Sequence, residues 1–409
     1  MKQALFPISA DPLTYGHLNV IEKALTLCDD SLIIVLLDNY YKKSSLPLPK
    51  RLALTKKAID YHFTTADTPH FAMNRSSQPL VKKIELVSWD GFLHDFMIER
   101  NIFTVIRGLR TTQDLSYERT IYSGYETQLK PLGLKPNVIY IMCDRTYQDI
   151  SSSLVKKLAL RGGTLTSLVP LPIKQSLEQT LRHQYKLIVT GSMGSGKSTL
   201  IPKLIANLKK ANIEAHHIDM DSIVATLYEM IAQGEKPMLN QQLATYFSLK
   251  TPFSKQDIRK IIFAPNRPNP KKDLQFLQQT LAPYIHSAYK QIIATQQGLL
   301  LIEAPQVIEY DLLKESNGFV LNVHCSETER KKRLLQTRDL SKTELANREA
   351  LTLSAKERLG LLKKSLSALN HGHLFSYDNS TPHAFTELSN LAKTIISKLN
   401  LKAISTERL

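Results

Sequence analysis

The segment that most constrains the fold of this chain is Gly191 to Thr199, whose sequence is GSMGSGKST. It follows an apolar run, Leu187 to Val189, and precedes a helical pattern from Leu200 to Lys210. This order of strand, glycine loop and helix is the one that a P-loop requires. Glycines allow backbone turns that a Cβ would hinder, so amides of the loop and of the helix N-terminus can converge on a phosphate group.

Within this segment, we expect Lys197 to reach the β- and γ-phosphates of a nucleotide and Ser198 to bind Mg²⁺. A glycine- and serine-rich turn without function is the alternative, but the complete spacing and both flanks argue against it. The predicted nucleotide-binding residues are Gly191, Gly194, Ser195, Gly196, Lys197, Ser198 and Thr199.

The composition of the chain limits its class and its partners. Its 409 residues, 43% hydrophobic, are enough for two domains with full cores. An excess of basic residues, 53 against 37 acidic ones, suits small anionic substrates, and no basic block is dense enough for a nucleic-acid tail. Three separated cysteines fit a reducing cytoplasm, residues 1–7 lack the long apolar core of a signal peptide, and no apolar run approaches the length of a membrane span. A homo-oligomer is compatible with the sequence.

Apolar runs typical of strands alternate with helical patterns through the first half. The expected strands cover residues 3–6, 32–37, 84–88, 103–106 and 138–142, and the expected helices include 18–25, 50–61 and 92–100. This alternation predicts a parallel sheet covered by helices. Open α/β sheets bind ligands at the carboxyl ends of their strands. There the sequence places His17, Arg107 to Glu118, and Ser151 to Ser153.

Four motifs of this half carry a family resemblance. Ser9 to His17 is similar to the T/HxGH signature of the nucleotidyltransferase superfamily, and Ser151 to Lys156 is similar to its ISSTxxR signature. The pattern from Arg107 to Glu118, together with Lys42-Lys43, resembles phosphopantetheine adenylyltransferase. The resemblance extends from about Gln3 to Leu171. It departs from the family at Ile8-Ser9-Ala10-Asp11, where Gly-Thr-Phe-Asp is usual, and at Tyr125, where asparagine is usual.

The resemblance implies adenylyl transfer from ATP to a phosphate acceptor, with a role for each motif residue. His17 would bind the α-phosphate, Lys42 and Arg107 the acceptor phosphate, and Arg110 with the serines the β- and γ-phosphates. Glu118 would contact the nucleotide or orient Arg110. The implied ATP-binding residues are Ser9, Ala10, His17, Gly108, Leu109, Arg110, Glu118, Tyr147, Ile150, Ser151, Ser152 and Ser153.

Each of these residues also has a structural interpretation that needs no ligand. His17 is compatible with a capping residue at a helix start, and Lys42 with a solvated charge. Ser151 is a suitable helix N-cap, which does not exclude phosphate binding. The two arginines are compatible with ion pairs to nearby carboxylates.

After the P-loop, an expected strand at 213–218 ends in Asp219-Met-Asp221. Two carboxylates there can supply a base toward a substrate hydroxyl and a ligand for Mg²⁺-bound water. Further motifs are Ile262-Phe263, Glu303-Ala-Pro305 with Glu309, and Arg333-Leu334 before a charged segment, 341–364, that we expect to form a helical lid. The basic residues Arg330 to Arg333 are compatible with a solvated face or a nucleotide contact. The histidine pairs around 216 and 371 show no third metal ligand.

These motifs resemble dephospho-CoA kinase over about Lys186 to Asn370. Ala225-Thr226 replaces the usual Ala-Arg, and Ala282-Pro283 replaces His-Pro. The lid arginine is displaced, with Lys356 or Arg358 as substitutes. Pro202 is expected to kink the helix after the P-loop.

The fold class predicted from the whole sequence is α/β, with two domains that each have a parallel sheet and flanking helices. A Rossmann-like nucleotidyltransferase domain covers 1–175, a connector 176–184, and a P-loop kinase domain with a helical lid 185–402. The predicted function is the pair of reactions that convert 4′-phosphopantetheine and ATP to dephospho-CoA and then to CoA, with Mg²⁺. Two alternatives stay open: an NMN adenylyltransferase joined to a ribosylnicotinamide kinase, and a nucleotide-binding regulatory protein with a decayed kinase domain.

Overall fold

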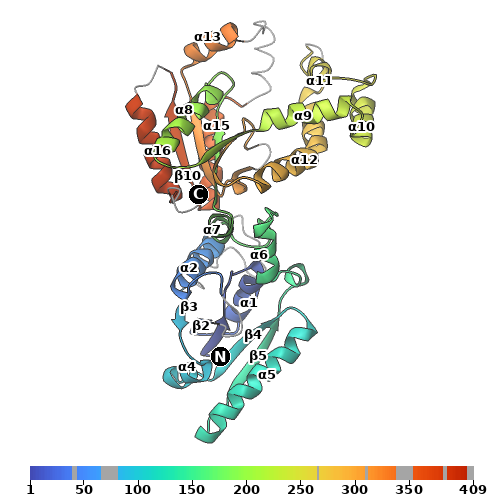
Figure 1. The fold of residues 1–409 in the computed structure, drawn as a ribbon. Helices are drawn as coiled ribbons and strands as arrows, with labels where there is room; N and C mark the ends of the chain where they lie inside the picture. The colour runs from blue at the N-terminus through green and yellow to red at the C-terminus, as the bar shows by residue number, and fades with distance from the viewer. Residues whose placement is uncertain are drawn as a thin grey trace. The chain divides into compact units, whose positions relative to one another are not determined.

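The computed structural model describes residues 1–38, 44–65, 82–264, 267–308, 312–337, 353–380 and 385–402. The chain divides into two compact units, Met1–Leu181 with Ala368–His371, and Arg182–Ser367 with Gly372–Leu409 (Figure 1). Among the described helices, none is both long and apolar enough to cross a membrane.

The first unit is built on a five-stranded parallel sheet in the order β3-β2-β1-β4-β5. Its strands are β1 (Gln3–Ile8), β2 (Ser31–Leu37), β3 (Ile84–Trp89), β4 (Thr104–Leu109) and β5 (Asn137–Met142). Its helices are α1 (Tyr15–Leu25), α2 (Leu48–Thr64), α4 (Leu93–Arg100), α5 (Thr112–Leu129), α6 (Ser152–Leu160) and α7 (Leu171–Leu181), with short 3-10 turns at Lys130–Leu132 and Arg145–Tyr147.

The run of apolar residues in β2 shows why helices cover both faces of this sheet. Leu32, Ile34 and Leu36 pack into one hydrophobic cluster, which includes residues of α1, α2 and α6. The intervening Ile33 and Val35 pack into a second cluster with α4 and β4. Successive side chains of a strand point to opposite faces, so a continuous apolar run requires cover on both sides.

The chain order of this sheet reverses at β1. The chain runs from β1 to β2 and β3 on one side, then returns to β4 and β5 on the other side. Such a reversal opens a crevice at the carboxyl ends of the two central strands. The loop after β1 and the loop after β4 therefore meet at a ligand-binding position.

The second unit also has a five-stranded parallel sheet, in the order β10-β9-β6-β8-β7. Its strands are β6 (Gln184–Thr190), β7 (Ala215–Asp219), β8 (Gly298–Glu303), β9 (Phe319–His324) and β10 (His373–Asp378). Its helices are α8 (Lys197–Lys210), α9 (Met220–Ala232), α10 (Pro237–Phe247), α11 (Lys255–Ile262), α12 (Pro270–Ala294), α13 (Glu327–Thr337), α15 (Ala355–Leu369) and α16 (Phe385–Leu399), with a 3-10 turn at Leu312–Lys314.

The central strand β6 leads directly into the glycine loop and α8. The apolar side chains of α8 pack with β6, β8, β9 and α16 in one cluster, so the helix that begins at Lys197 is anchored to the sheet. The α8 helix continues from Lys197 to Lys210 through Pro202, so the proline does not break it. The two sheets with helices confirm the predicted α/β class. Part of the expected lid, 341–352, lies outside the described residues, as does Glu309.

Two candidate nucleotide sites

His17 lies in the first turn of α1, at the carboxyl end of β1. The backbone N–H of Thr14 donates to His17 Nδ1 at 3.1 Å, and the Thr14 hydroxyl lies 2.8 Å from the same atom. Burial, and next the charge of Arg110, lower the pKa of His17 to about 4. A neutral imidazole whose Nδ1 accepts a hydrogen bond carries its proton on Nε2. His17 is therefore a helix-capping residue whose neutral imidazole keeps an N–H donor on Nε2.

Arg110 and Asp114 form one unit at the end of β4. The Arg110 backbone N–H donates to the Asp114 carboxylate at 2.9 Å, and its guanidinium donates at 3.1 and 3.2 Å. Burial opposes the ionised form of Asp114, but the hydrogen bonds from Arg110 outweigh it and lower the pKa. Because Arg110 also lowers the pKa of His17, the fold brings the predicted α-phosphate and β/γ-phosphate ligands together.

Glu118 pairs with Arg107, which corrects the expectation that it orients Arg110. Arg107 Nε donates to Glu118 Oε2 at 2.5 Å, and its NH1 donates to Pro7 O at 3.2 Å. The Arg107 side chain is 17% exposed and that of Glu118 is 12% exposed. Asp114 already neutralises Arg110 in the first turn of α5, and Glu118 lies one turn later, beside β4. Burial raises the pKa of Tyr125, which lies two turns further along α5 and near this pair.

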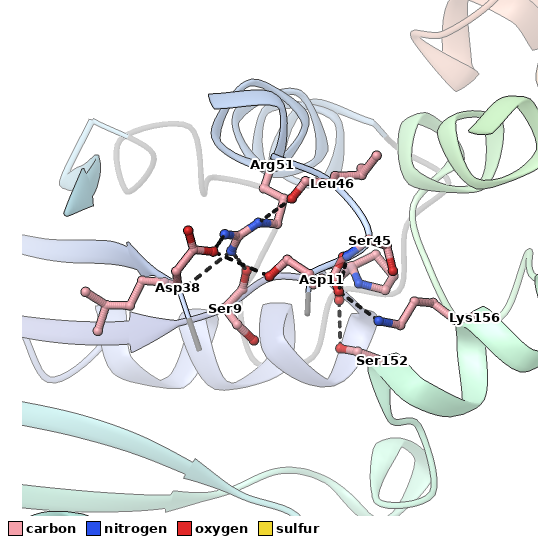
Figure 2. Close-up of polar contacts among 11 residues, drawn as sticks. Ser9, Asp11, Asp38, Ser45, Leu46, Arg51, Ser152 and Lys156 are labelled. Atoms are coloured by element: carbon pink, nitrogen blue, oxygen red, sulfur yellow. Dashed lines mark hydrogen bonds and ion pairs between the residues drawn. The ribbon is translucent and has the colours of Figure 1, made fainter. Parts of the chain in front are cut away.

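The serine motif begins α6 and contacts the loop after β1. Ser151 is the N-cap, since its Oγ accepts from Leu154 N at 3.1 Å. Ser152 Oγ donates to Pro12 O at 2.8 Å, and Lys156 Nζ donates to Asp11 Oδ2 at 2.7 Å (Figure 2). The N-terminus of this helix thus faces the loop that leads to His17, as a shared phosphate site requires.

The remaining predicted ATP-binding residues of this unit lie at the ends of β1 and β4 and around the start of α6. Ala10 has a φ of +44° in the loop after β1. Leu109, Tyr147 and Ile150 are buried, Ser153 is exposed, and a Cβ on Gly108 would lie 3.0 Å from Val20. Lys42 lies outside the described residues. Asp11 and the buried Arg51 had no role assigned to them from the sequence, although an arginine among the apolar positions of an expected helix was a signal for Arg51.

The glycine loop of the second unit is closely packed. Lys197 Nζ donates to Gly191 O at 2.9 Å and to Ser192 O at 3.3 Å, so the lysine folds over its own loop. A Cβ on Gly191 would lie 2.1 Å from Val323 O, and one on Gly196 would lie 2.2 Å from Asn379 Nδ2. At Gly191 the clash is with backbone, so only glycine fits, and at Gly196 the φ of +86° favours glycine although the Asn379 side chain could move.

A carboxylate from the neighbouring strand meets the P-loop serine. Ser198 Oγ donates to Glu303 Oε1 at 2.8 Å, and His217 Nε2 lies 3.1 Å from Glu303 Oε2. Asp219 pairs in register with Glu303 on the adjacent strand. A hydroxyl beside carboxylates is the oxygen donor set that Mg²⁺ accepts when phosphates complete its shell, so these residues fit the metal that the family implies. Glu303 as the partner of Ser198 was not foreseen.

Asp219 and Asp221 surround the start of α9. Asp219 is the N-cap, accepting from Asp221 N at 2.9 Å and from Ser222 Oγ at 2.6 Å. Asp221 is exposed. Burial, and next the charge of Arg259, lower the pKa of Lys255, while both aspartates act to raise it. Lys255, the first residue of α11, thus lies near the aspartate pair.

The basic residues of α13 and α15 contact the loops of this site. Arg330 NH1 donates to Met193 O at 3.4 Å within the glycine loop. Arg333 NH2 donates to Asn379 O at 2.7 Å, and Asn379 Nδ2 donates to Ser195 O at 2.9 Å. These two arginines are therefore not a solvated face.

Arg358 is buried and donates to the carbonyl of Pro305. Of the two proposed substitutes for the displaced lid arginine, Arg358 approaches the Glu303-Ala-Pro305 motif.

Each half of the chain matches a different known protein family. Residues 5–158 match the family model described as cytidylyltransferase-like, and residues 185–371 match the one described as dephospho-CoA kinase. A phosphopantetheine adenylyltransferase from Clostridium botulinum is 32% identical over 190 residues, which are 46% of this chain and 100% of the relative.

Two solved structures are also similar, at TM-scores too low to carry an argument. A dephospho-CoA kinase from Campylobacter jejuni covers 53% of this chain and 98% of its own, at 19% identity and a TM-score of 0.28. A NadR protein in complex with NAD and AMP-PNP covers 98% of this chain and 97% of its own, at 12% identity and a TM-score of 0.30.

Fold and sites together define a transferase with two ATP-using α/β domains, a nucleotidyltransferase followed by a P-loop kinase. The chain belongs to the phosphopantetheine adenylyltransferase family through its first half and carries a dephospho-CoA kinase domain in its second.

Proposed function

We propose that this chain catalyses two successive reactions of coenzyme A synthesis. The first domain transfers the adenylyl group of ATP to 4′-phosphopantetheine, and the second phosphorylates the ribose 3′-hydroxyl of the resulting dephospho-CoA with another ATP. The observation that carries the proposal is the presence of both family matches in one chain, because the product of the first is the substrate of the second.

In the first step, an oxygen of the acceptor phosphate attacks the α-phosphorus of ATP and pyrophosphate leaves. Negative charge develops on the phosphate oxygens, so the site works through donors and cations. The neutral His17 donates to the α-phosphate. Arg110 and the N-terminus of α6 hold the β- and γ-phosphates, and Arg107, fixed by Glu118, holds the acceptor phosphate with Lys42.

In the second step, the 3′-hydroxyl oxygen attacks the γ-phosphorus of ATP and ADP leaves. The loop amides and Lys197 bind the β- and γ-phosphates. A carboxylate of the Asp219–Asp221 pair accepts the hydroxyl proton. Ser198 and Glu303 are the residues that would hold Mg²⁺, which neutralises charge on the phosphate oxygens when bound.

Incubation of the purified chain with ATP, Mg²⁺ and 4′-phosphopantetheine, followed by mass spectrometry, tests the proposal. Dephospho-CoA and then CoA are expected. Absence of both products removes the proposal, and dephospho-CoA without CoA supports a kinase domain that has lost activity.

The NMN alternative has no better support from the comparisons, and formation of NAD from NMN and ATP would favour it. We further propose the domain limits 1–175 and 185–402, a cytoplasmic location and small phosphorylated substrates as the partners.

A further inference from the structure

Arg51 is a buried cation that links several loops of the first unit. Its side chain leaves the first turn of α2 and is 1% exposed. Its Nε donates to Leu46 O at 3.1 Å. One terminal nitrogen donates to the carbonyls of Ser9 and Leu37, and the other donates to the Asp38 carboxylate. Figure 2 shows the guanidinium reaching from its helix to these acceptors.

The position of these acceptors in the sheet indicates the role of the arginine. The last residues that pair between β1 and β2 are Ile8 and Leu36. Arg51 binds the carbonyls of the next residue along each strand, Ser9 and Leu37, so its side chain continues the link between the strands where the backbone ladder ends. A buried guanidinium requires this many acceptors and a counter-charge, and Asp38 supplies the charge.

A second set of contacts ties the same loops together. Asp11 Oδ2 accepts from Ser45 N at 3.0 Å and from Lys156 Nζ at 2.7 Å. The loop after β1 is thus held by Arg51 at its start and by Asp11 further on, and the segment before α2 is held through Leu46 and Ser45 (Figure 2). The loop ends at Thr14, whose backbone N–H holds His17. A shift of this loop would therefore move the imidazole.

We propose that Arg51 is a positioning residue for adenylyl transfer. It fixes the loop of residues 9–14 against the carboxyl end of β2, so that Ser9 and His17 meet the phosphates of ATP. Arg51 does not touch the reacting atoms. This inference rests on the adenylyl transfer proposed above for the first domain.

Two substitutions distinguish the effect of the Arg51 hydrogen bonds from the effect of its positive charge. Arg51→Lys keeps the cation beside Asp38, but a lysine donates from one nitrogen and cannot hold acceptors in several directions. Arg51→Met removes both. Arg100→Lys is the matched control, because Arg100 pairs with Glu85 at 3.2 Å and is 39% exposed. The kinase activity of the same chain serves as an internal control.

We expect Arg51→Lys to lower kcat/KM for adenylyl transfer about 10- to 100-fold, with most of the change in the KM for ATP, because small misplacements of ligand-binding groups have effects of this size. The effect of Arg51→Met should be larger. Arg100→Lys and the kinase step should stay within about 2-fold of wild type by the same reasoning. A purely structural role would reduce the folded fraction, which lowers kcat and leaves the KM for ATP unchanged. That result overturns the proposal.

Hydrogen–deuterium exchange tests the position of the loop without any substrate. Peptides covering residues 9–14 and 44–47 should exchange faster in Arg51→Lys than in wild type or Arg100→Lys. Unchanged exchange overturns the positioning role even in an active enzyme. A wild-type chain without adenylyl transfer counts against the proposed function, and the exchange result still decides the role of Arg51.

Discussion

The substitution Gly191→Ala should destabilise the second unit selectively. Gly191 has a φ of +151°, and a Cβ there would lie 2.1 Å from the carbonyl oxygen of Val323. Val323 is buried in β9 and pairs with Tyr377 of β10, so its carbonyl cannot move without disturbing that pairing. Gly234 is the matched control, with a φ of +81° and nothing within 4 Å of the added Cβ.

Both variants place an alanine at positive φ, but only Gly191→Ala also adds a steric clash. An alanine at positive φ costs about 1–2 kcal/mol of folding free energy, which is the whole effect expected for Gly234→Ala. Forcing a methyl group into packed structure costs about 1–3 kcal/mol more, so Gly191→Ala should cost about 2–5 kcal/mol. Gly360 lies in the middle of α15, where an added Cβ would meet no atom within 4 Å. Gly360→Ala should therefore raise the free energy of unfolding by about 0.5–1 kcal/mol.

Urea titration followed by two signals measures these differences. The chain has a single tryptophan, Trp89 in β3, so its fluorescence follows only the first unit, whereas far-ultraviolet circular dichroism follows both. With a urea slope of about 2 kcal/mol/M, Gly191→Ala should lower the midpoint of the second unit by about 1–2.5 M and leave the Trp89 transition unchanged. Equal midpoints for Gly191→Ala and Gly234→Ala would refute the steric reasoning, as would an equal shift of the Trp89 transition.

Three further predictions concern the two sites. Lys197→Met should lower the kinase rate at least about 1000-fold, because the charge on the transferred phosphate loses its cation, and an assay of both steps should find adenylyl transfer unchanged. Because the pKa of His17 is lowered to about 4, His17 stays neutral above about pH 5. Any inflection of kcat/KM for adenylyl transfer at about pH 6 should therefore come from the substrate phosphates and persist in His17→Gln, and an inflection that disappears in His17→Gln would contradict the assignment. Glu118→Gln leaves Arg107 partly buried without a counter-charge, so the KM for 4′-phosphopantetheine should rise about 10-fold or more. An unchanged KM would show that Arg107 does not bind the acceptor phosphate.

The sequence by itself determined the local elements of this protein and the motifs that they carry. Each strand of the first sheet appeared as a short apolar run, and the glycine loop was recognisable between its strand and its helix. These signals are contained within a few consecutive residues, because strand burial, helix periodicity and loop turns depend on near neighbours. The α/β class and both family resemblances followed from them.

Only the tertiary structure decided which distant residues share a site. Ser198 meets Glu303, 105 residues later in the chain, because β8 is the neighbour of β6 in the sheet. Glu118 pairs with Arg107 and not with Arg110, and the role of Arg51 depends on where two neighbouring strands end. Strand order and register determine these contacts, and they are set by the packing of the whole domain, which no local pattern in the sequence records.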